Sequence, residues 1–318
     1  MNSLNGLSPN YSGASGYQTS DDCAIYKLDS GETLLQTVDF FTPIVNNPFD
    51  FGRIAAANSL SDIYAMGGKP IFALNVVGFP SDDLELEILI EILKGGQAVA
   101  DEAGIPVLGG HTIKDKEPKY GMAVTGIAPK SGPIQNCNSK VGDILIITKP
   151  LGTGIISTAI KKDICPPGLL DTAVSTMVKL NSFASMKMQG ITHACTDITG
   201  YGLLGHLNEM CLGSDVSAVL EYSNIPFIPG VEKLAKDGVI PGGTKKNLDF
   251  VSGVVKFSNS IEKYQKLMIA DAQTSGGLLL SCNEEYAEDF VDQMNTAGNF
   301  AKIIGYITDK NNKSIVVK

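Results

Sequence analysis

The order of apolar and polar positions in the first 140 residues predicts strands that alternate with helices. Short apolar or alternating runs bounded by turn residues are typical of strands, and apolar residues three or four positions apart are typical of a helix. The predicted elements are strands at 23–28 and 33–41, a helix at 51–68, a strand at 70–80, a helix at 84–104, and strands at 107–110 and 120–128. This order predicts an α+β domain with helices on one face of a mixed sheet.

A polar, turn-rich segment at 131–143 separates this half of the chain from the next. We therefore expect one domain over residues 1–140 and a second α+β domain over residues 141–318. The predicted elements of the second domain are a strand at 144–149, helices at 155–162 and about 171–188, a turn containing Asp197, a helix at 202–213, and strands at 216–222, 276–282 and 303–309.

The composition is that of a globular protein large enough for two cores. Hydrophobic residues make up 43% of the 318 positions, and the net charge of −9 opposes binding to nucleic acid. No apolar run approaches the roughly 20 residues of a membrane span, and residues 1–10 lack a signal-peptide pattern, so we expect a cytoplasmic protein with no membrane partner. The cysteines and histidines form no CxxC or HxxxH pattern, which argues against a zinc site.

Acidic residues occupy four places where the pattern is otherwise apolar. Asp21 and Asp22 precede a predicted strand, Asp39 ends one, Asp62 lies inside a predicted helix, and Asp197 lies in a predicted turn. A desolvated carboxylate is costly unless it is paired, protonated or bound to a metal. Hard cations such as Mg²⁺ prefer oxygen ligands and usually also hold substrate phosphates, so we expect a magnesium site and phosphoryl-transfer chemistry.

Each aspartate site also has an ordinary structural explanation. Asp62 shares a helix face with Asn58, four residues earlier, and one such carboxylate often caps a neighbouring backbone. Asp39 precedes Phe-Phe-Thr-Pro, where it can form an Asx turn. The pair Asp21–Asp22 is typical of a solvated surface, and Asp197 can interact with the dipole of the helix that follows. The metal hypothesis gains its weight from the occurrence of all four.

Residues 109–121 are predicted to form a glycine-rich loop between two strands. The loop contains Gly110, His111, Thr112 and Lys114, whose backbone amides, hydroxyl and ammonium groups could contact a polyphosphate. A lone histidine is more often structural than catalytic, so His111 is taken as a lining residue. No GxxxxGK[ST] motif is present, and ATP chemistry would therefore depend on metals held by carboxylates.

A competing motif indicates dinucleotide binding. Residues Gly200–Gly205 match GxGxxG at the start of a predicted helix, and Glu221 follows at about the spacing of an NAD fingerprint. Asp197 lies three residues before the first glycine and would repel a pyrophosphate, and residues 192–199 are polar for a buried parallel strand. NAD binding is therefore the weaker alternative.

Several segments together resemble the selenophosphate synthetase (selenide, water dikinase) family over nearly the whole chain. The segments are SDDCAIY, TVDFFTPIVNNPFDFGRIAAANSLSDIYAMGGKP, GGHTIKDKEPKYGMAVTG, TDITGYGLLGHLNEM and QTSGGLLL. The resemblance implies a two-domain fold like that of aminoimidazole ribonucleotide synthetase, with dimerisation through the first domain. It also implies a phosphotransferase that converts ATP, selenide and water to selenophosphate, AMP and phosphate.

The resemblance further implies roles for individual residues. Magnesium would be held by the residues that match the family's carboxylates, which are Asp22, Asp39, Asp62 and Asp197. Nucleotide contacts would come from residues in three parts of the sequence: Thr19, Ser20, Asp21, Asp39, Asp62, Gly110, His111 and Thr112. In the family, the segment that matches Gly110–Thr112 reaches across the dimer to the ATP site.

One departure from the family concerns its catalytic segment. The family carries a reactive cysteine or selenocysteine with a lysine three residues later, and residues 1–18 contain neither cysteine nor lysine. No catalytic residue is therefore assigned, and the catalytic pair is expected before Met1. Either a gene model restarted after a selenocysteine codon, or the chain is a non-catalytic, regulatory Mg²⁺-ATP-binding homologue. We expect the chain as given to bind Mg²⁺-ATP and to make little selenophosphate.

Overall fold

The chain forms two compact units in this computed structural model, which describes residues 14–15 and 21–318. The first unit holds the chain up to Pro133 together with Val178–Ser182, and the second holds Ile134–Met177 and Phe183–Lys318. Among the described residues, every helix falls short of the length or the apolarity that a bilayer-spanning helix requires.

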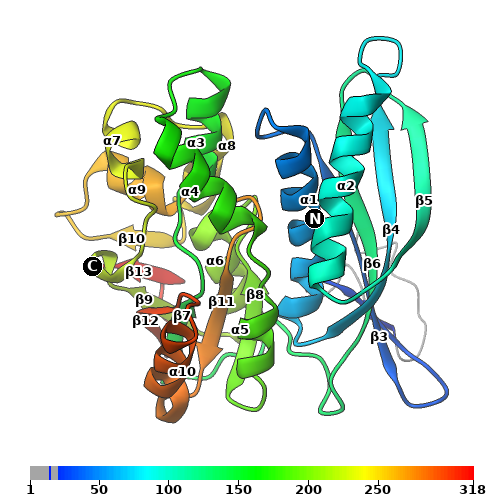
Figure 1. Cartoon of the computed structure of the whole chain (residues 1–318). Coiled ribbons are helices and arrows are strands. Elements are labelled where there is room, and N and C mark those ends of the chain that lie inside the picture. The colour runs from blue at the N-terminus through cyan, green and yellow to red at the C-terminus, as the bar shows by residue number, and fades with distance from the viewer. Residues whose placement is uncertain (1–13, 16–20) are drawn as a thin grey trace. The chain divides into compact units, whose positions relative to one another are not determined.

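The first unit is built on a six-stranded mixed sheet (Figure 1). Strands β4 and β5 run parallel, whereas the other neighbouring strands pair antiparallel. In spatial order the strands are β1 (Ala14–Ser15), β2 (Ala24–Lys27), β3 (Thr33–Phe41), β6 (Lys119–Ile127), β4 (Lys69–Phe79) and β5 (Val107–Lys114). The predicted mixed sheet is confirmed, and β3 has the bounds that its alternating pattern predicted.

Two helices, α1 (Pro48–Ala65) and α2 (Leu86–Glu102), pack against each other, and α1 packs on the sheet. The side chain of Asn47 caps the start of α1 by accepting a backbone hydrogen bond. The two helix backbones touch where glycines face the other helix. A Cβ atom at Gly52 would lie 1.9 Å from the carbonyl oxygen of Ile92, so only glycine allows this approach.

Strand β3 has two faces of opposite character. Leu35 and Thr37 are buried on the face that meets α1. Val38 and Phe40 point to the other face, where their side chains are 57% and 51% exposed. Because side chains alternate along a strand, this register places Asp39 on the same face as Thr37, toward the helix.

Strand β5 is longer than expected. Residues 109–121 were predicted to be a glycine-rich loop, but β5 continues to Lys114, and that prediction was wrong for Gly110, His111 and Thr112. The glycines are needed inside the strand: Gly110 has φ +149°, and a Cβ there would lie 2.1 Å from the carbonyl oxygen of Asn75 in β4. The glycine at position 110 is therefore explained by the close approach of β4 and β5, and not by a turn.

The second unit is built on a seven-stranded mixed sheet. In spatial order its strands are β10 (Val255–Phe257), β13 (Ile315–Val317), β9 (Ser217–Leu220), β12 (Lys302–Thr308), β7 (Ile144–Ile147), β11 (Leu278–Cys282) and β8 (Thr192–Asp197). β10, β13 and β9 are parallel, and the remaining pairs are antiparallel.

Helices cover this sheet and complete its core. The helices are α3 (Thr153–Lys161), α4 (Pro167–Val178), α5 (Ser182–Lys187), α6 (Gly202–Ser214), α7 (Val231–Lys236), α8 (Gly242–Val251), α9 (Lys263–Ile269), α10 (Glu284–Thr296) and the short 3₁₀ helix η1 (Tyr222–Asn224). The apolar side of α6, including Leu203 and Leu207, packs into one core with strand residues such as Leu145 and Leu279. A single helix had been predicted over about 171–188; it is instead divided into α4 and α5.

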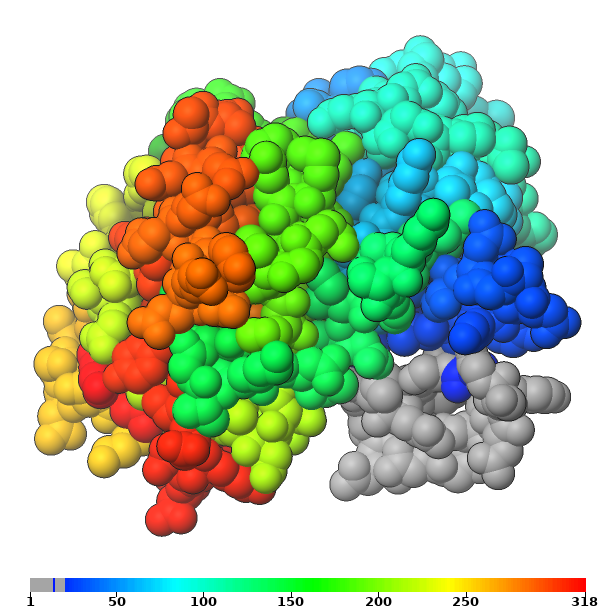
Figure 2. All heavy atoms as spheres, turned by 90° about the horizontal axis from the view of Figure 1, so that it is seen from below, coloured from blue at the N-terminus to red at the C-terminus, as the bar shows by residue number. Residues whose placement is uncertain are grey.

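Helices α5 and α10 lie side by side on the surface of the second unit, where α10 is orange in Figure 2. A shallow hollow of about 350 Å³ lies between them. The ammonium group of Lys187 lies over the ring of Phe183, 5.6 Å from its centre, at one wall of the hollow. The charged residues of its lining, Lys187 and Asp292, are not buried.

Candidate functional site

The candidate site in the first unit begins with two matched pairs of polar residues on β3 and α1. Asn58 donates a hydrogen bond from Nδ2 to Oδ2 of Asp39 at 2.7 Å, and the hydroxyl of Thr37 donates to Oδ2 of Asp62. Thr37 and Asp39 are two positions apart on the strand, and Asn58 and Asp62 are four positions apart on the helix. Residues two apart on a strand and four apart on a helix share a face, so the carboxylates of Asp39 and Asp62 lie between β3 and α1. We call this row the carboxylate strip; Thr37 and Asp39 are about 7 Å apart along it.

Asp22 adds a third carboxylate to this strip. One carboxylate oxygen of Asp22 lies within 4.8 Å of one from Asp62. Two carboxylates at this spacing repel each other, and a divalent cation between them would convert that repulsion into attraction. The donor set contains only oxygen, which fits Mg²⁺ and does not fit the softer metals that select sulfur or imidazole. Thr19 and Ser20, the neighbouring predicted nucleotide contacts, lie outside the described residues.

The environment of Asp39 disfavours its charge when no cation is near. Burial raises the pKa of Asp39 above its ordinary value, and the hydrogen bond from Asn58 opposes that shift. Desolvation is the larger of the two effects, so the neutral donor compensates only part of the cost. A bound cation would favour the ionised carboxylate, as expected of a metal ligand.

In the second unit, Asp197 lies at the end of a buried strand. Its side chain is 2% exposed, and Asp197 is the last residue of β8. The prediction that it lies in a turn was wrong. The segment before it had been judged too polar for a buried parallel strand; β8 is antiparallel to its neighbour β11, and Ala194 and Cys195 are its buried apolar residues. The helix that follows begins at Gly202 with Tyr201 at its N-cap position, so Asp197 does not cap α6.

The topology around Gly200–Gly205 does not match a dinucleotide-binding fold. Such a fold requires the strand before the glycines and the strand after the helix to be parallel neighbours or near-neighbours in one βαβ unit. Within the described residues, β8 is at the sheet edge and pairs only with β11, antiparallel, whereas β9 is separated from it by β12, β7 and β11. The NAD alternative is therefore not favoured.

The turn after Asp197 is held by a buried histidine. His206 on α6 accepts a hydrogen bond at Nε2 from the backbone N–H of Thr199, at 3.2 Å. Burial lowers the pKa of His206 to about 4, so the ring is neutral in the folded protein at neutral pH. The ordinary value of 6.5 applies once the chain unfolds.

This histidine predicts a loss of stability in mild acid. The unfolded chain takes up a proton below pH 6.5, and the folded ring does not until about pH 4, so stability is lost as pH falls through that window. We expect His206 to reduce the free energy of unfolding by about 2 kcal/mol between pH 7.5 and pH 5. Urea unfolding at both pH values measures the change. His206→Gln, which keeps an acceptor, should remove this part of the pH dependence, and an unchanged difference would contradict the assignment.

Residues 110–112 lie away from the carboxylate strip within this chain. Asp39, Met122, Asn75 and Gly110 occupy one row across β3, β6, β4 and β5. Three strand spacings separate Asp39 from Gly110, about 14 Å. His111 is exposed on the edge strand. The structure thus brings Asp22, Asp39 and Asp62 together in the first unit and leaves Gly110, His111 and Thr112 apart from them.

Thr37, whose hydroxyl donates a hydrogen bond to Asp62, was not predicted as a site residue. The available signal was its position two residues before Asp39 on an alternating strand, which places both side chains on one face. Asp271 and Gln273, two buried polar residues before β11, were not predicted either. The backbone amides of α3 that they bind lie more than 100 residues away, and no local pattern could indicate this contact.

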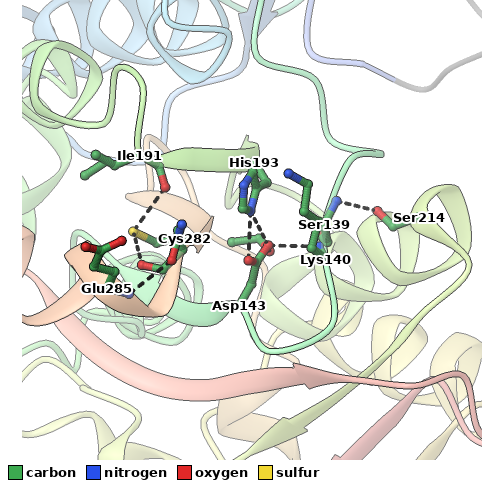
Figure 3. Close-up of polar contacts among 10 residues, drawn as sticks. Ser139, Lys140, Asp143, Ile191, His193, Ser214, Cys282 and Glu285 are labelled. Carbon is green, nitrogen blue, oxygen red and sulfur yellow. Dashed lines mark hydrogen bonds and ion pairs between the residues drawn. The ribbon is translucent and has the colours of Figure 1, made fainter.

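A second polar cluster lies at the other end of the same sheet from Asp197 (Figure 3). Asp143, 3% exposed, accepts hydrogen bonds from His193 Nδ1 (2.8 Å), the hydroxyl of Ser281 (2.7 Å) and the backbone N–H of Lys140 (2.9 Å). Burial raises the pKa of the neighbouring Cys282 to about 11, and its thiol donates to backbone carbonyls. The cluster joins the start of β7 to β8 and β11, and its cysteine is a buried core residue.

Comparisons with known proteins agree with this geometry. Residues 20–128 match the family model for the AIR synthase related protein, N-terminal domain, and residues 140–318 match that for its C-terminal domain. A solved structure described as AaThiL complexed with AMPPCP and TMP has a TM-score of 0.72 at 16% identity, covering 99% of this chain and 90% of its own. This likeness confirms the two-domain AIR synthase-like fold.

Similarity to curated proteins is much higher. The selenide, water dikinase of Myxococcus xanthus (strain DK1622) is 50% identical over 297 residues, which are 92% of this chain and 84% of that protein. The selenide, water dikinase of Clostridioides difficile (strain 630) is 46% identical over 304 residues, 95% of this chain and 87% of that protein. The chain therefore belongs to the selenide, water dikinase family.

Proposed function

We propose that this chain catalyses the ATP-dependent synthesis of selenophosphate, in which ATP, selenide and water give selenophosphate, AMP and phosphate. The observation that carries the proposal is the carboxylate strip of Asp22, Asp39 and Asp62 in a chain 50% identical to a selenide, water dikinase. The regulatory, non-catalytic alternative is not favoured, because the similar proteins are named for the synthetic reaction.

The proposal assigns Mg²⁺ to Asp22, Asp39 and Asp62 of the first unit and to Asp197 of the second. When bound, Mg²⁺ would neutralise phosphate charge and polarise the bond that breaks. The protein's own part is to hold the ligands: Asn58 orients the carboxylate of Asp39, and Thr37 orients that of Asp62. Such outer hydrogen bonds commonly fix ligand geometry in metal sites.

Nucleotide contacts are proposed for Asp21 beside the strip, and for Thr19 and Ser20 outside the described residues. Gly110, His111 and Thr112 are proposed to contact the nucleotide of a second copy of the chain. Their position three strands from Asp39 supports this arrangement, because they do not reach the strip within their own sheet. The cytoplasm is the proposed compartment.

A homodimer is proposed through the exposed face of the first unit's sheet. On that face, opposite α1, β3 presents Val38 and Phe40, and other strands of the sheet also carry exposed large apolar residues: Tyr26, Leu74, Leu108 and Ile113. Monomeric proteins rarely expose a contiguous apolar patch of this kind, and a second copy of the same sheet would cover it.

Selenide-dependent AMP formation tests the proposed function. The protein is incubated anaerobically with Mg²⁺-ATP, with and without selenide, and AMP is measured by chromatography and selenophosphate by ³¹P NMR. Residues 1–18 alone led us to expect little turnover, but the relatives are named for the synthetic reaction, so we expect AMP when both Mg²⁺ and selenide are present and not when either is omitted. Binding of Mg²⁺-ATP with no selenide-dependent AMP would instead support the regulatory alternative.

A further inference from the structure

The amides at the start of α3 are bound by side chains from a distant loop. The turn from β7 into α3 contains Gly152 and Gly154, a geometry that often binds a phosphate at the helix N-terminus. Here the carboxylate of Asp271 takes that place: its Oδ2 accepts hydrogen bonds from the backbone N–H groups of Gly154 and Ile155, both at 3.1 Å. The site is therefore filled by an internal anion.

Gln273 completes the same contact. Its Oε1 accepts from the backbone N–H groups of Gly152 (2.9 Å) and Thr153 (3.1 Å), and from the hydroxyl of Thr153 (3.1 Å). Its Nε2 donates to Oδ2 of Asp271 at 3.1 Å, and the hydroxyl of Thr244 donates to Oδ1 of Asp271 at 2.7 Å. The first amides of α3, which have no partner within the helix, are thus satisfied by two neighbouring side chains.

The two side chains are almost fully enclosed. Asp271 is 0% exposed and Gln273 is 4% exposed. Burial raises the pKa of Asp271 to about 7, against the four hydrogen bonds that favour its ionised form. The carboxylate therefore depends on these donors for its charge, and the donors depend on it for a partner.

The loop that carries these residues also holds the turn after Asp197. The backbone N–H of Gln273 donates to the carbonyl of Thr199 at 2.9 Å, and the N–H of Ile198 donates to the carbonyl of Gly277 at 2.9 Å. A Cβ at Gly276 would lie 2.0 Å from the carbonyl oxygen of Ile198, so loop and turn are in direct backbone contact.

The same loop contacts a buried lysine at the end of β7. The ammonium group of Lys149, 4% exposed, donates to the carbonyl of Ser275 at 2.8 Å. Ser275 has φ +48°, an unusual backbone conformation for a residue with a side chain. A Cβ at Gly277 would lie 2.3 Å from the backbone nitrogen of Lys149. The loop is therefore fixed between the ends of β7 and β8.

We propose that Asp271 and Gln273 are positioning residues that, by binding the amides of α3, set the backbone that carries Asp197 and Lys149. The expected effect of Asp271 and Gln273 on Mg²⁺-ATP binding rests on the proposed function, in which Asp197 is a metal ligand. Their expected effect on the order of the turn after Asp197 rests on the hydrogen bonds alone.

Exchange of one carboxylate for one amide tests the proposal. Asp271→Asn removes the carboxylate charge that faces the backbone amides of α3. Gln273→Glu places two carboxylates beside each other. The double variant again has one carboxylate and one amide, in exchanged positions. Backbone hydrogen exchange of Ile198 and Gln273 is measured at pH 8, where Asp271 is ionised. We expect each single variant to exchange about tenfold faster at both amides, and the double variant to recover most of the protection.

Affinity for Mg²⁺-ATP, measured per folded molecule by calorimetry, gives the functional readout. We expect the single variants to bind about 10- to 100-fold more weakly, with recovery in the double variant. Asp143→Asn is the matched control, since it removes a buried carboxylate that contacts His193, and His193 lies four residues, about 13 Å, along β8 from Asp197. It should lower the unfolding temperature and leave both readouts at their wild-type values.

The outcomes separate this inference from the proposed function. Unchanged exchange at Ile198 and Gln273 in both single variants would overturn the positioning role, as would a double variant no better protected than the singles. If a single variant does not fold, protection in the folded double variant decides. Wild-type protein that fails to bind Mg²⁺-ATP would refute the proposed function, and the exchange data would still decide the positioning role.

Discussion

Replacing Asp39 by asparagine should abolish Mg²⁺-dependent ATP binding without destabilising the metal-free protein. Asparagine has the same shape and can still accept the hydrogen bond from Asn58. It removes a carboxylate whose charge is disfavoured by burial, so the metal-free variant should unfold at the wild-type temperature or higher. It also removes an anionic ligand, so we expect a loss of at least about 100-fold in affinity for Mg²⁺-ATP.

Thermal unfolding with and without ligand measures both effects at once. A ligand present at about 100 times its dissociation constant stabilises the folded state by about 2.7 kcal/mol, and this gain should disappear in the Asp39→Asn variant. Asp101→Asn is the control, because Asp101 lies on the exposed surface of α2 and contacts Gln97 only through a surface hydrogen bond. An Asp39→Asn variant that retains the ligand-induced shift would show that Asp39 is structural.

Replacing Phe40 by lysine should convert the proposed dimer into monomers. Phe40 is 51% exposed in the single chain, on the apolar face of the sheet. In a dimer that covers this face, an ammonium group would be buried without a partner. Central aromatic residues of interfaces commonly contribute 2 kcal/mol or more, so we expect dissociation to become at least about 30-fold more favourable.

Sedimentation across a range of protein concentrations measures this change. Leu212→Lys is the matched control, because Leu212 is an exposed leucine on α6 in the second unit. It should leave the oligomeric state unchanged. Wild-type protein that sediments as a monomer, or a Phe40→Lys variant that dimerises as the wild type does, would refute the proposed interface.

Most elements of the fold could be predicted from local pattern. The alternation of β3 gave the bounds 33–41, because one face packs on α1 and the other does not. The errors arose where a distant contact overrides local composition. Gly109 and Gly110 indicate a turn by composition, yet they lie within β5, where the approach of Asn75 in β4 requires glycine at position 110. Asp197 was placed in a turn, yet it is the last residue of β8, where it lies opposite Leu278 of β11.

The part of the candidate site that depends on spacing within one element could also be predicted. The four-residue spacing of Asn58 and Asp62 on α1 correctly placed them on one face. The contact of Thr37 with Asp62 depends on how β3 is placed against α1, which no spacing within either element reveals. The contact of Asp271 with α3 joins segments 116 or more residues apart, and only the folded sheet brings them together.

The first unit is not a continuous stretch of chain. It includes Val178–Ser182, and the side chain of Asn181 donates a hydrogen bond to the hydroxyl of Ser61 on α1 at 2.9 Å. A fragment ending at Pro133 would lack this segment, so the unit cannot be isolated by a single truncation. The chain also passes between the units three times, after Pro133, Met177 and Ser182. Each unit therefore draws on two separate stretches of the chain, and neither can be produced whole as one uninterrupted fragment.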